Sequence, residues 1–265
     1  MMIRSLMLLV SSVLPSCLAS CCAAQVPVRY QEGIAHGFLT LRTTDGRLIA
    51  EGESAQTAKD GVVTSRIVFH FKDGSLYDDT TTFSQKGHFR LLKDHAVQKG
   101  PAFKQQLEST IDAQNGKVTV HFEKDGKPKE LEESVELPAD VSNGLIFTIV
   151  KNLLSNPVTT VSYLAIAPKP TLVKLVFTRQ GQEKLKAGAT RQPGAHFVMK
   201  VEIGGIKGVL ASILKKKPPD TQMWVLDEEV PTFVASEGPL DGDGPIWKIN
   251  LVSPERLRQS AEEPR

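Results

Sequence analysis

The sequence predicts a mainly β protein in which a concave antiparallel sheet wraps one buried apolar helix. Short stretches with alternating hydrophobic residues follow one another from residue 34 to about residue 135. Alternation of this kind is typical of strands with one buried face. Turn dipeptides separate the stretches, and one long apolar segment at residues 140–154 interrupts them. A nearly all-apolar helix that follows a sheet needs a concave surface to cover it.

Two stretches show the alternation most clearly, and each places three apolar side chains on one face. These core-face residues are Ile67, Phe69 and Phe71 in the first stretch, and Val118, Val120 and Phe122 in the second. Five dipeptides between the stretches tolerate the positive φ angles of tight hairpins. The five are Asp45-Gly46, Asp60-Gly61, Asp73-Gly74, Asn115-Gly116 and Asp125-Gly126.

The apolar segment at residues 140–154 predicts a helix of about fifteen residues, too short to cross a bilayer. Asp140 or Ser142 can cap its start, and Asn156-Pro157 ends it. Its apolar side chains cover most of the helix surface, so we expect them to form the core or to line an apolar cavity. They include Leu145, Ile146, Phe147, Ile149, Val150 and Leu153.

Strands are expected to resume after this helix. The predicted strands cover residues 159–167, 172–178, 196–203, 222–225 and 246–251. Trp224 and Trp247 are expected to fill the core as large aromatic side chains. Because no linker divides the chain, residues 34–253 are predicted to form a single β-rich domain, with a flexible tail at residues 254–265.

The N-terminus has the features of a secretory signal peptide. Arg4 precedes an apolar run at residues 6–14, and small residues and cysteines follow. One interpretation is a lipoprotein signal of residues 1–20, because residues 18–20 have the apolar, small, small order that precedes a lipidated cysteine, here Cys21. The alternative is cleavage after Ala24, which would release a soluble protein. Both interpretations predict export, to the periplasm or to a membrane-anchored position in the cell envelope.

Under the lipoprotein interpretation, residues 21–33 form a tether between the anchor and the domain. Removal of residues 1–20 leaves only Cys21 and Cys22, so no disulfide can link parts of the domain. The formal net charge of +2 gives no excess of positive charge for a phosphate backbone, so nucleic acid is not an expected partner. The sequence contains no complete motif for a cofactor or a metal ion, so neither a cofactor nor a metal is expected.

Two other groups of residues are candidate sites. A histidine on the polar face of each of three predicted strands allows a metal-dependent enzyme or hydrolase as an alternative function: His70, His121 and His196. Asp78, Asp79 or Glu202 would assist them. Asp78 and Asp79 are adjacent in a strand and point to opposite faces, so these two carboxylates cannot share a proton.

A compact basic patch is formed by Lys215, Lys216 and Lys217. It is either a solvated loop or a surface for anionic lipid head groups, with about 1 kcal/mol of attraction per lysine near such a surface. This second interpretation depends on attachment of the protein to a membrane.

Several segments together resemble an uncharacterised family of exported bacterial β-rich proteins, itself distantly similar to the LolA/LolB-like lipoprotein-localisation superfamily. The segments are residues 73–76, 81–85, 97–101, 137–144, 237–240 and 244–247. The resemblance implies a strongly curved antiparallel sheet, a half-open barrel around the apolar helix. It brings no catalytic residues.

Export, an apolar helix and a sheet with one aromatic-rich face together predict a non-enzymatic envelope protein. Its partner is expected to be an apolar or lipid-like ligand, or another envelope protein. Two alternatives stay open beside it, the histidine enzyme and a scaffold that pairs with another protein through its sheet edges.

Overall fold

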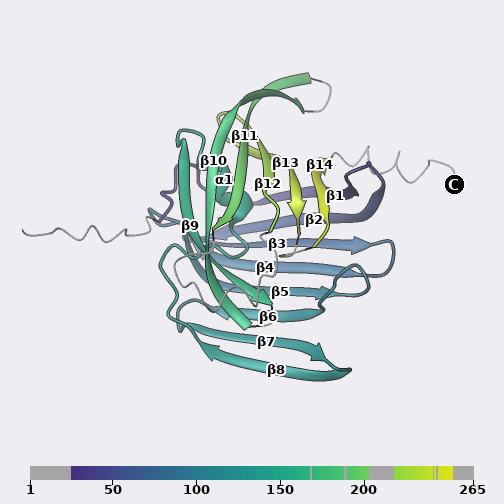
Figure 1. The fold of residues 1–265 in the computed structure, drawn as a ribbon. Coiled ribbons are helices and arrows are strands. Elements are labelled where there is room, and N and C mark those ends of the chain that lie inside the picture. Colours follow the sequence, from purple (N-terminus) through teal and green to yellow (C-terminus); the bar gives the residue numbers. More distant parts are fainter. Residues whose placement is uncertain are drawn as a thin grey trace, which may run out of the picture.

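The structure, a computed structural model, describes residues 25–167, 169–187, 190–202, 218–240, 242 and 244–252. Its strands form one antiparallel sheet of 14 strands (Figure 1), so the mainly β prediction is confirmed. The strands are β1 (Ala35–Thr43), β2 (Leu48–Lys59), β3 (Val62–Phe71), β4 (Leu76–Ser84), β5 (Arg90–Lys99), β6 (Leu107–Asp112), β7 (Lys117–Lys124), β8 (Lys127–Ser134), β9 (Val158–Ala167), β10 (Lys169–Ala187), β11 (Thr190–Glu202), β12 (Thr221–Leu226), β13 (Thr232–Pro239) and β14 (Ile246–Val252).

The first and last described strands, β1 and β14, meet in the middle of the sheet. Strands β1 to β8 form a meander that ends at the edge strand β8. The chain then crosses to the opposite edge, β9, and a second meander returns to β14, which pairs with β1 from Phe38↔Val252 to Thr43↔Trp247. Each half of the sheet is therefore built from consecutive hairpins, and one crossover joins them.

The expected half-open barrel is wrong. The edge strands β8 and β9 do not pair, and the sheet is open and not strongly curled. Right-handed twist accumulates over so many strands, and the strands of the two halves run at a steep angle to each other in Figure 1. Hydrophobic side chains from both halves share one core, such as Phe83 and Ile111 with Phe177 and Phe197. Twist thus brings the halves together without barrel closure.

The helix is much shorter than the sequence suggested. Helix α1 covers only Ile146–Lys151, six residues. Gly144 adopts a φ of 65°, which a right-handed helix does not allow, so the helix begins after it. Asp140 does not cap the helix, because its carboxylate accepts hydrogen bonds from Ser162 N at 3.0 Å and Ser162 Oγ at 2.7 Å in β9. Ser142 is also bound to β9, through the carbonyl oxygen of Ser162.

The hairpin prediction is confirmed at all five dipeptides, since each glycine has a positive φ. Asp60 and Gly61 have φ angles of 54° and 79°, and they join β2 to β3 with no other residue between the strands. Asp125 and Gly126 do the same between β7 and β8, with φ angles of 55° and 71°. Two consecutive positive φ angles match the twist of the flanking strands.

The second half of the sheet differs from the prediction in several ways. Strand β13 was not predicted, and β10 continues well past the expected end at residue 178 through an irregularity between Arg179 and Gly181. Trp247 is 6% exposed and lies in the core, as expected. Trp224 lies instead on the opposite face from the buried Met223 and stacks on the ring of His196 at 5.0 Å.

Residues 25–33, expected as part of a tether, pack against the body of the protein. Val26 is buried, and Pro27 forms a bridge with His88. The carboxylate of Glu32 is paired with Lys151 of α1, with a shortest distance of 2.6 Å. Residues 25–33 therefore fix the helix to the first half of the sheet.

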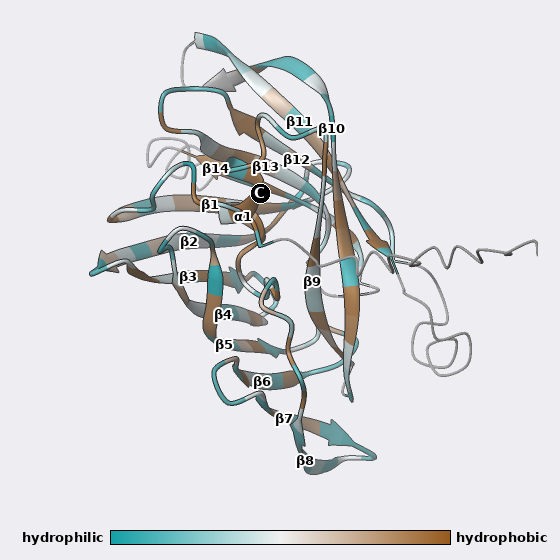
Figure 2. Ribbon diagram, turned by 90° about the vertical axis from the view of Figure 1, so that its left-hand side faces the viewer, coloured by the Kyte–Doolittle hydropathy of each residue, from teal (hydrophilic) through white to brown (hydrophobic). Residues whose placement is uncertain are grey.

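Both edges of the sheet carry features that oppose pairing with another protein. Strand β8 is mostly exposed and rich in Lys and Glu, and it contains Pro128. The hydrophilic end of the sheet at β8 is visible in Figure 2, where β9 and β10 show long hydrophobic runs. In the middle of β9, Asn143 occupies the edge by exchanging two hydrogen bonds with the backbone of Leu164, at 2.9 and 3.0 Å.

Three predicted features lie outside the described residues: the signal peptide with Cys21, the patch at Lys215, Lys216 and Lys217, and the tail at residues 254–265. Within the described residues, no helix has the length and hydrophobicity that a membrane span requires.

Candidate functional site

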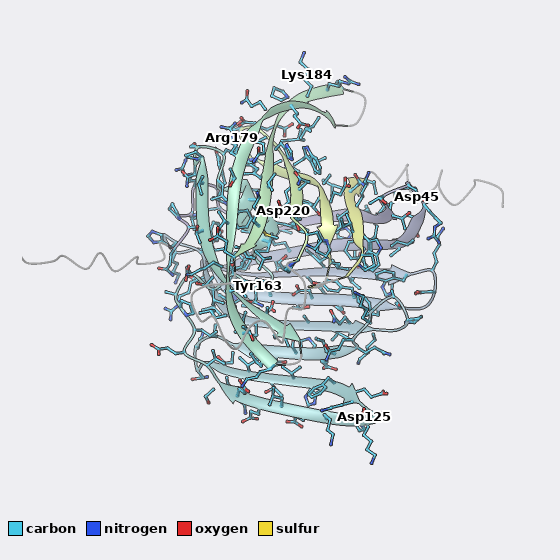
Figure 3. All side chains as sticks on the ribbon, viewed as in Figure 1. Asp45, Asp125, Tyr163, Arg179, Lys184 and Asp220 are labelled. Carbon is cyan, nitrogen blue, oxygen red and sulfur yellow. The ribbon has the colours of Figure 1, made fainter. Side chains whose placement is uncertain are left out.

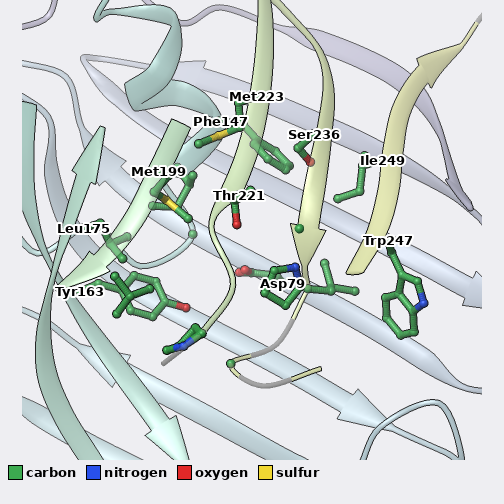
Figure 4. Close-up of a pocket in the computed structure, with 18 of the residues that line it drawn as sticks. Asp79, Phe147, Tyr163, Leu175, Met199, Thr221, Met223, Ser236, Trp247 and Ile249 are labelled. Atoms are coloured by element: carbon green, nitrogen blue, oxygen red, sulfur yellow. The ribbon is translucent and has the colours of Figure 1, made fainter. Parts of the chain in front are cut away.

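A cavity of about 210 Å³ lies where the two halves of the sheet approach each other (Figure 4). Strands β1, β3 and β4 contribute to one side, and strands β9 to β14 contribute to the other. Its wall is mostly apolar and includes Phe69, Leu175, Met199, Met223, Trp247 and Ile249. Apolar walls with a few polar groups are typical of small-molecule sites, although this volume is below the usual range of about 300–1,000 Å³.

The predicted helix residues divide into two groups. Ile146 and Phe147 are partly buried and line the cavity. The ring of Phe147 stacks on that of Phe233 with centroids 4.0 Å apart. The other predicted residues are at most 2% exposed and belong to the core beneath the cavity: Leu145, Ile149, Val150 and Leu153. The segment therefore supplies both the cavity wall and its support, as the sequence allowed.

Polar groups gather at one end of the cavity. Tyr77, Asp79 and Tyr163 line it there, and Figure 4 shows the Tyr163 hydroxyl and the Asp79 carboxylate directed into the cavity. The alternation of β4 places Tyr77, Asp79 and Thr81 on the inner face of the sheet. The Tyr77 hydroxyl donates a hydrogen bond to Asp79 Oδ2 at 3.2 Å, and Thr81 Oγ1 lies 3.2 Å from Asp79 Oδ1.

A second carboxyl group, that of Asp94, lies behind Asp79. In the β4–β5 register Asp94 is opposite Thr81, while Asp79 is opposite Ala96, so the two carboxyl groups are diagonal neighbours on one face. Thr81 Oγ1 is 2.8 Å from Asp94 Oδ1. Asp94 is only 4% exposed and does not line the cavity, so Asp79 is the member of the pair that a ligand can reach.

Burial and mutual repulsion change the titration of this pair. Loss of solvent raises the pKa of Asp79 above its ordinary value, and hydrogen bonds from neighbours reduce this rise. The pKa of Asp94 is raised well above its ordinary value, first by burial and then by the charge of Asp79. Two close carboxyl groups cannot both ionise easily, so the pair shares a proton over part of the pH range.

The two tyrosines respond to the same surroundings. Burial raises the pKa of Tyr77 and that of Tyr163, and the negative charges of Asp79 and Asp94 raise both further. Both phenols therefore stay neutral at physiological pH. The Tyr163 hydroxyl has no hydrogen-bond partner in the described part of the chain, so it is free to bind a ligand at this end of the cavity.

Of the Asp79–Asp94 pair, only Asp79 was a candidate site residue in the sequence analysis. Asp78 and Asp79 do point to opposite faces, as expected: Asp78 pairs with Arg66 at 2.6 Å on the outer face, while Asp79 faces the cavity. The partner that shares the proton is Asp94, which the sequence reading missed. The sequence contained one indication of a polar site in the interior: Tyr77, Asp79 and Thr81 are polar residues on the same strand face as the buried Phe83.

The three strand histidines are not brought together. His70, His121 and His196 lie in β3, β7 and β11. Strands β3 and β7 are four positions apart in the sheet and β3 and β11 are six, which corresponds to about 19 Å and about 29 Å along the sheet. No group of three metal-binding side chains occurs within the described ranges. The histidines therefore do not form a common metal site.

Comparisons with protein-family models, curated proteins and solved structures find no match to this chain. The resemblance to an exported β-rich family therefore stays a prediction.

Proposed function

We propose that this protein is a non-enzymatic binding protein that holds an apolar or lipid-like ligand in the cavity between the two halves of its sheet. The observation that carries the proposal is the wall of this cavity. Side chains from β1, β3, β4 and β9 to β14 converge there, and most of them are apolar. Water in such a space makes few hydrogen bonds, so its displacement by an apolar ligand is favourable.

The composition of the polar end supports binding rather than covalent chemistry. Among the described residues, the ionisable ones that line the cavity are Asp79, Tyr77 and Tyr163, and none of them is a strong nucleophile in its neutral or hydrogen-bonded form. Their hydroxyl and carboxyl groups can instead orient the polar end of an amphiphile. A few placed polar groups in an apolar wall are what orientation requires.

We further propose that the protein acts outside the cytoplasm, as the N-terminal residues 1–24 suggest. A lipid-anchored form through Cys21 and contact between Lys215–Lys217 and anionic head groups belong to the same proposal. An exported protein with an apolar cavity is suited to hold a lipid-like molecule in the envelope.

The proposal is tested by extraction of ligands from the purified full-length protein. Native mass spectrometry of wild type should show a bound apolar molecule, and organic extraction should recover it. Ala165 lines the cavity from β9, so Ala165→Phe should fill the cavity and remove the bound molecule. Ala55 is exposed on β2, so Ala55→Phe adds the same ring away from the cavity and should leave binding intact.

Two results would contradict the proposal. The first is a wild-type protein that carries no ligand and takes up none from mixed lipid extracts. The second is a bound molecule that Ala165→Phe retains at the wild-type level, since the ligand would then lie elsewhere.

A further inference from the structure

Among the described residues, the carboxyl pair of Asp79 and Asp94 has no positively charged partner. The hydrogen bonds that Asp79 and Asp94 receive from other residues come from the neutral hydroxyl groups of Tyr77 and Thr81. In the part of the chain that the structure describes, no Lys, Arg or His side chain forms an ion pair with either carboxylate. A buried negative charge without a cation is costly.

Other buried carboxylates of this protein do have such a partner. Glu32 is paired with Lys151 at 2.6 Å, and Asp140 lies 3.5 Å from Lys174 Nζ. The Asp79–Asp94 pair differs from them because it borders an open cavity instead of a lysine. The missing positive charge can therefore come from a molecule inside the cavity.

The packing around the pair directs its charge towards the cavity. Gly144 covers Asp94 so closely that a Cβ atom at this position would lie 2.6 Å from Asp94 Oδ1. Gly144 therefore leaves no room for a ligand on its side of Asp94, whereas Asp79 lines the cavity together with Tyr163. Phe69, Tyr77 and Tyr163 also line the cavity, and aromatic rings attract a cation that lies over their faces.

We propose that the cavity takes an amphiphile with a positively charged nitrogen, whose head group pairs with Asp79 while its apolar chain contacts the cavity wall. This inference rests on the proposed function and adds the chemical class of the ligand. An ammonium head group donates hydrogen bonds to the Asp79 carboxylate and to the free Tyr163 oxygen. A carboxylate head group would place a second negative charge against Asp79 and is excluded by repulsion.

The test compares three amphiphiles with the same medium-length alkyl chain, decylamine, decanol and decanoate, below their micelle concentrations. Calorimetric titration of the purified full-length protein at neutral pH gives the three dissociation constants. Decylamine should bind about tenfold more tightly than decanol, as expected for a hydrogen bond between charged groups. Decanoate should bind more weakly than decanol.

Asp79→Asn should abolish the preference for the amine, so that decylamine binds no more tightly than decanol to this variant. Asp78→Asn is the matched control, because it removes the neighbouring carboxylate on the outer face, where Asp78 pairs with Arg66. This control should retain the wild-type preference. If Asp79→Asn does not fold, the three dissociation constants of the wild-type protein are sufficient to test the inference.

Each outcome has one meaning. Equal binding of decylamine and decanol, or tightest binding of decanoate, overturns the inference and leaves the proposed function intact. A wild-type affinity for decylamine in folded Asp79→Asn also overturns the inference alone. Failure of all three amphiphiles to bind overturns the proposed function and the inference with it.

Discussion

Gly144 lies directly against Asp94 in the fold. A Cβ atom on Gly144 would fall 2.6 Å from Asp94 Oδ1 and closer still to the side chain of Thr81. Gly144 also has a φ of 65°, where side chains other than glycine are strained. One residue without a side chain thus lets the crossover segment cover the carboxyl pair and start α1 over the cavity.

Gly144→Ala should therefore destabilise the protein for two reasons, backbone strain and steric overlap. We expect a loss of about 2–4 kcal/mol in the free energy of unfolding. Gly126→Ala is the control, since Gly126 has a φ of 71° but no atom within 4 Å of an added Cβ. It should lose only about 1 kcal/mol. Urea melts that give equal losses for the two variants would show that Gly144 is not packed against Asp94.

Asp94→Asn should change the pH dependence of stability. The pKa of Asp94 is raised in the folded state, so the folded protein binds more protons than the unfolded chain between the two pKa values. The stabilisation that Asp94 contributes to the wild-type protein is fully present below about pH 4. It is lost as the pH rises through the pKa of Asp94 in the folded state. The titratable groups that interact with the charge of Asp94 are Asp79, Tyr77 and Tyr163.

Asparagine does not ionise, so the stability of Asp94→Asn relative to wild type should improve between about pH 5 and about pH 8. Urea melts at the two pH values measure this difference. A constant difference across the range would mean that Asp94 titrates normally and is not buried with Asp79.

Leu153→Ala should cost more stability than Phe147→Ala, although Phe is the larger side chain. Leu153 is 1% exposed in the core, so its truncation leaves a closed void and lowers the free energy of unfolding by about 2–5 kcal/mol. Phe147 already borders the cavity, so its removal enlarges a space that exists and mainly loses the stacking on Phe233. A larger loss for Phe147→Ala in thermal melts would place Phe147 in a filled core.

Cys21→Ala tests the proposed lipid anchor. A diacylglyceryl group on Cys21 holds a protein on a membrane through two chains, at about 0.8 kcal/mol per buried methylene. The variant should move from the membrane fraction to the soluble periplasm, or remain as uncleaved precursor. A wild-type protein that is wholly soluble and begins at Gln25 would contradict the anchor.

The hairpin turns of the fold could be predicted from the sequence, because each turn depends on its own residues. Each Asp-Gly or Asn-Gly pair specifies a hairpin through its own backbone preference. Strand β13 could not be predicted from its residue types, because it contains Ser236, Gly238 and Pro239, which usually mark turns. The helix was predicted too long because hydrophobicity alone could not show that Asp140 and Ser142 bind β9 instead.

The pairing of Asp79 with Asp94 could not be predicted from the sequence for a different reason. Asp79 and Asp94 lie in neighbouring strands, and their contact depends on the register of β4 and β5. That register shifts between Thr82 and Phe83, which changes the residues that share a face. A tertiary irregularity of this kind has no signature in hydrophobic alternation.

The central claim, an apolar ligand in this cavity, is tested most directly by the two tryptophans of the chain. Trp247 lines the cavity, whereas Trp224 stacks on His196 on the other face of the sheet. Titration with a terminally brominated alkyl alcohol should quench the fluorescence of Trp247 with saturation, measured in Trp224→Phe. In Trp247→Phe, the remaining Trp224 should show no saturable quenching. Quenching of Trp224 alone, or of neither tryptophan, would contradict a ligand in the cavity.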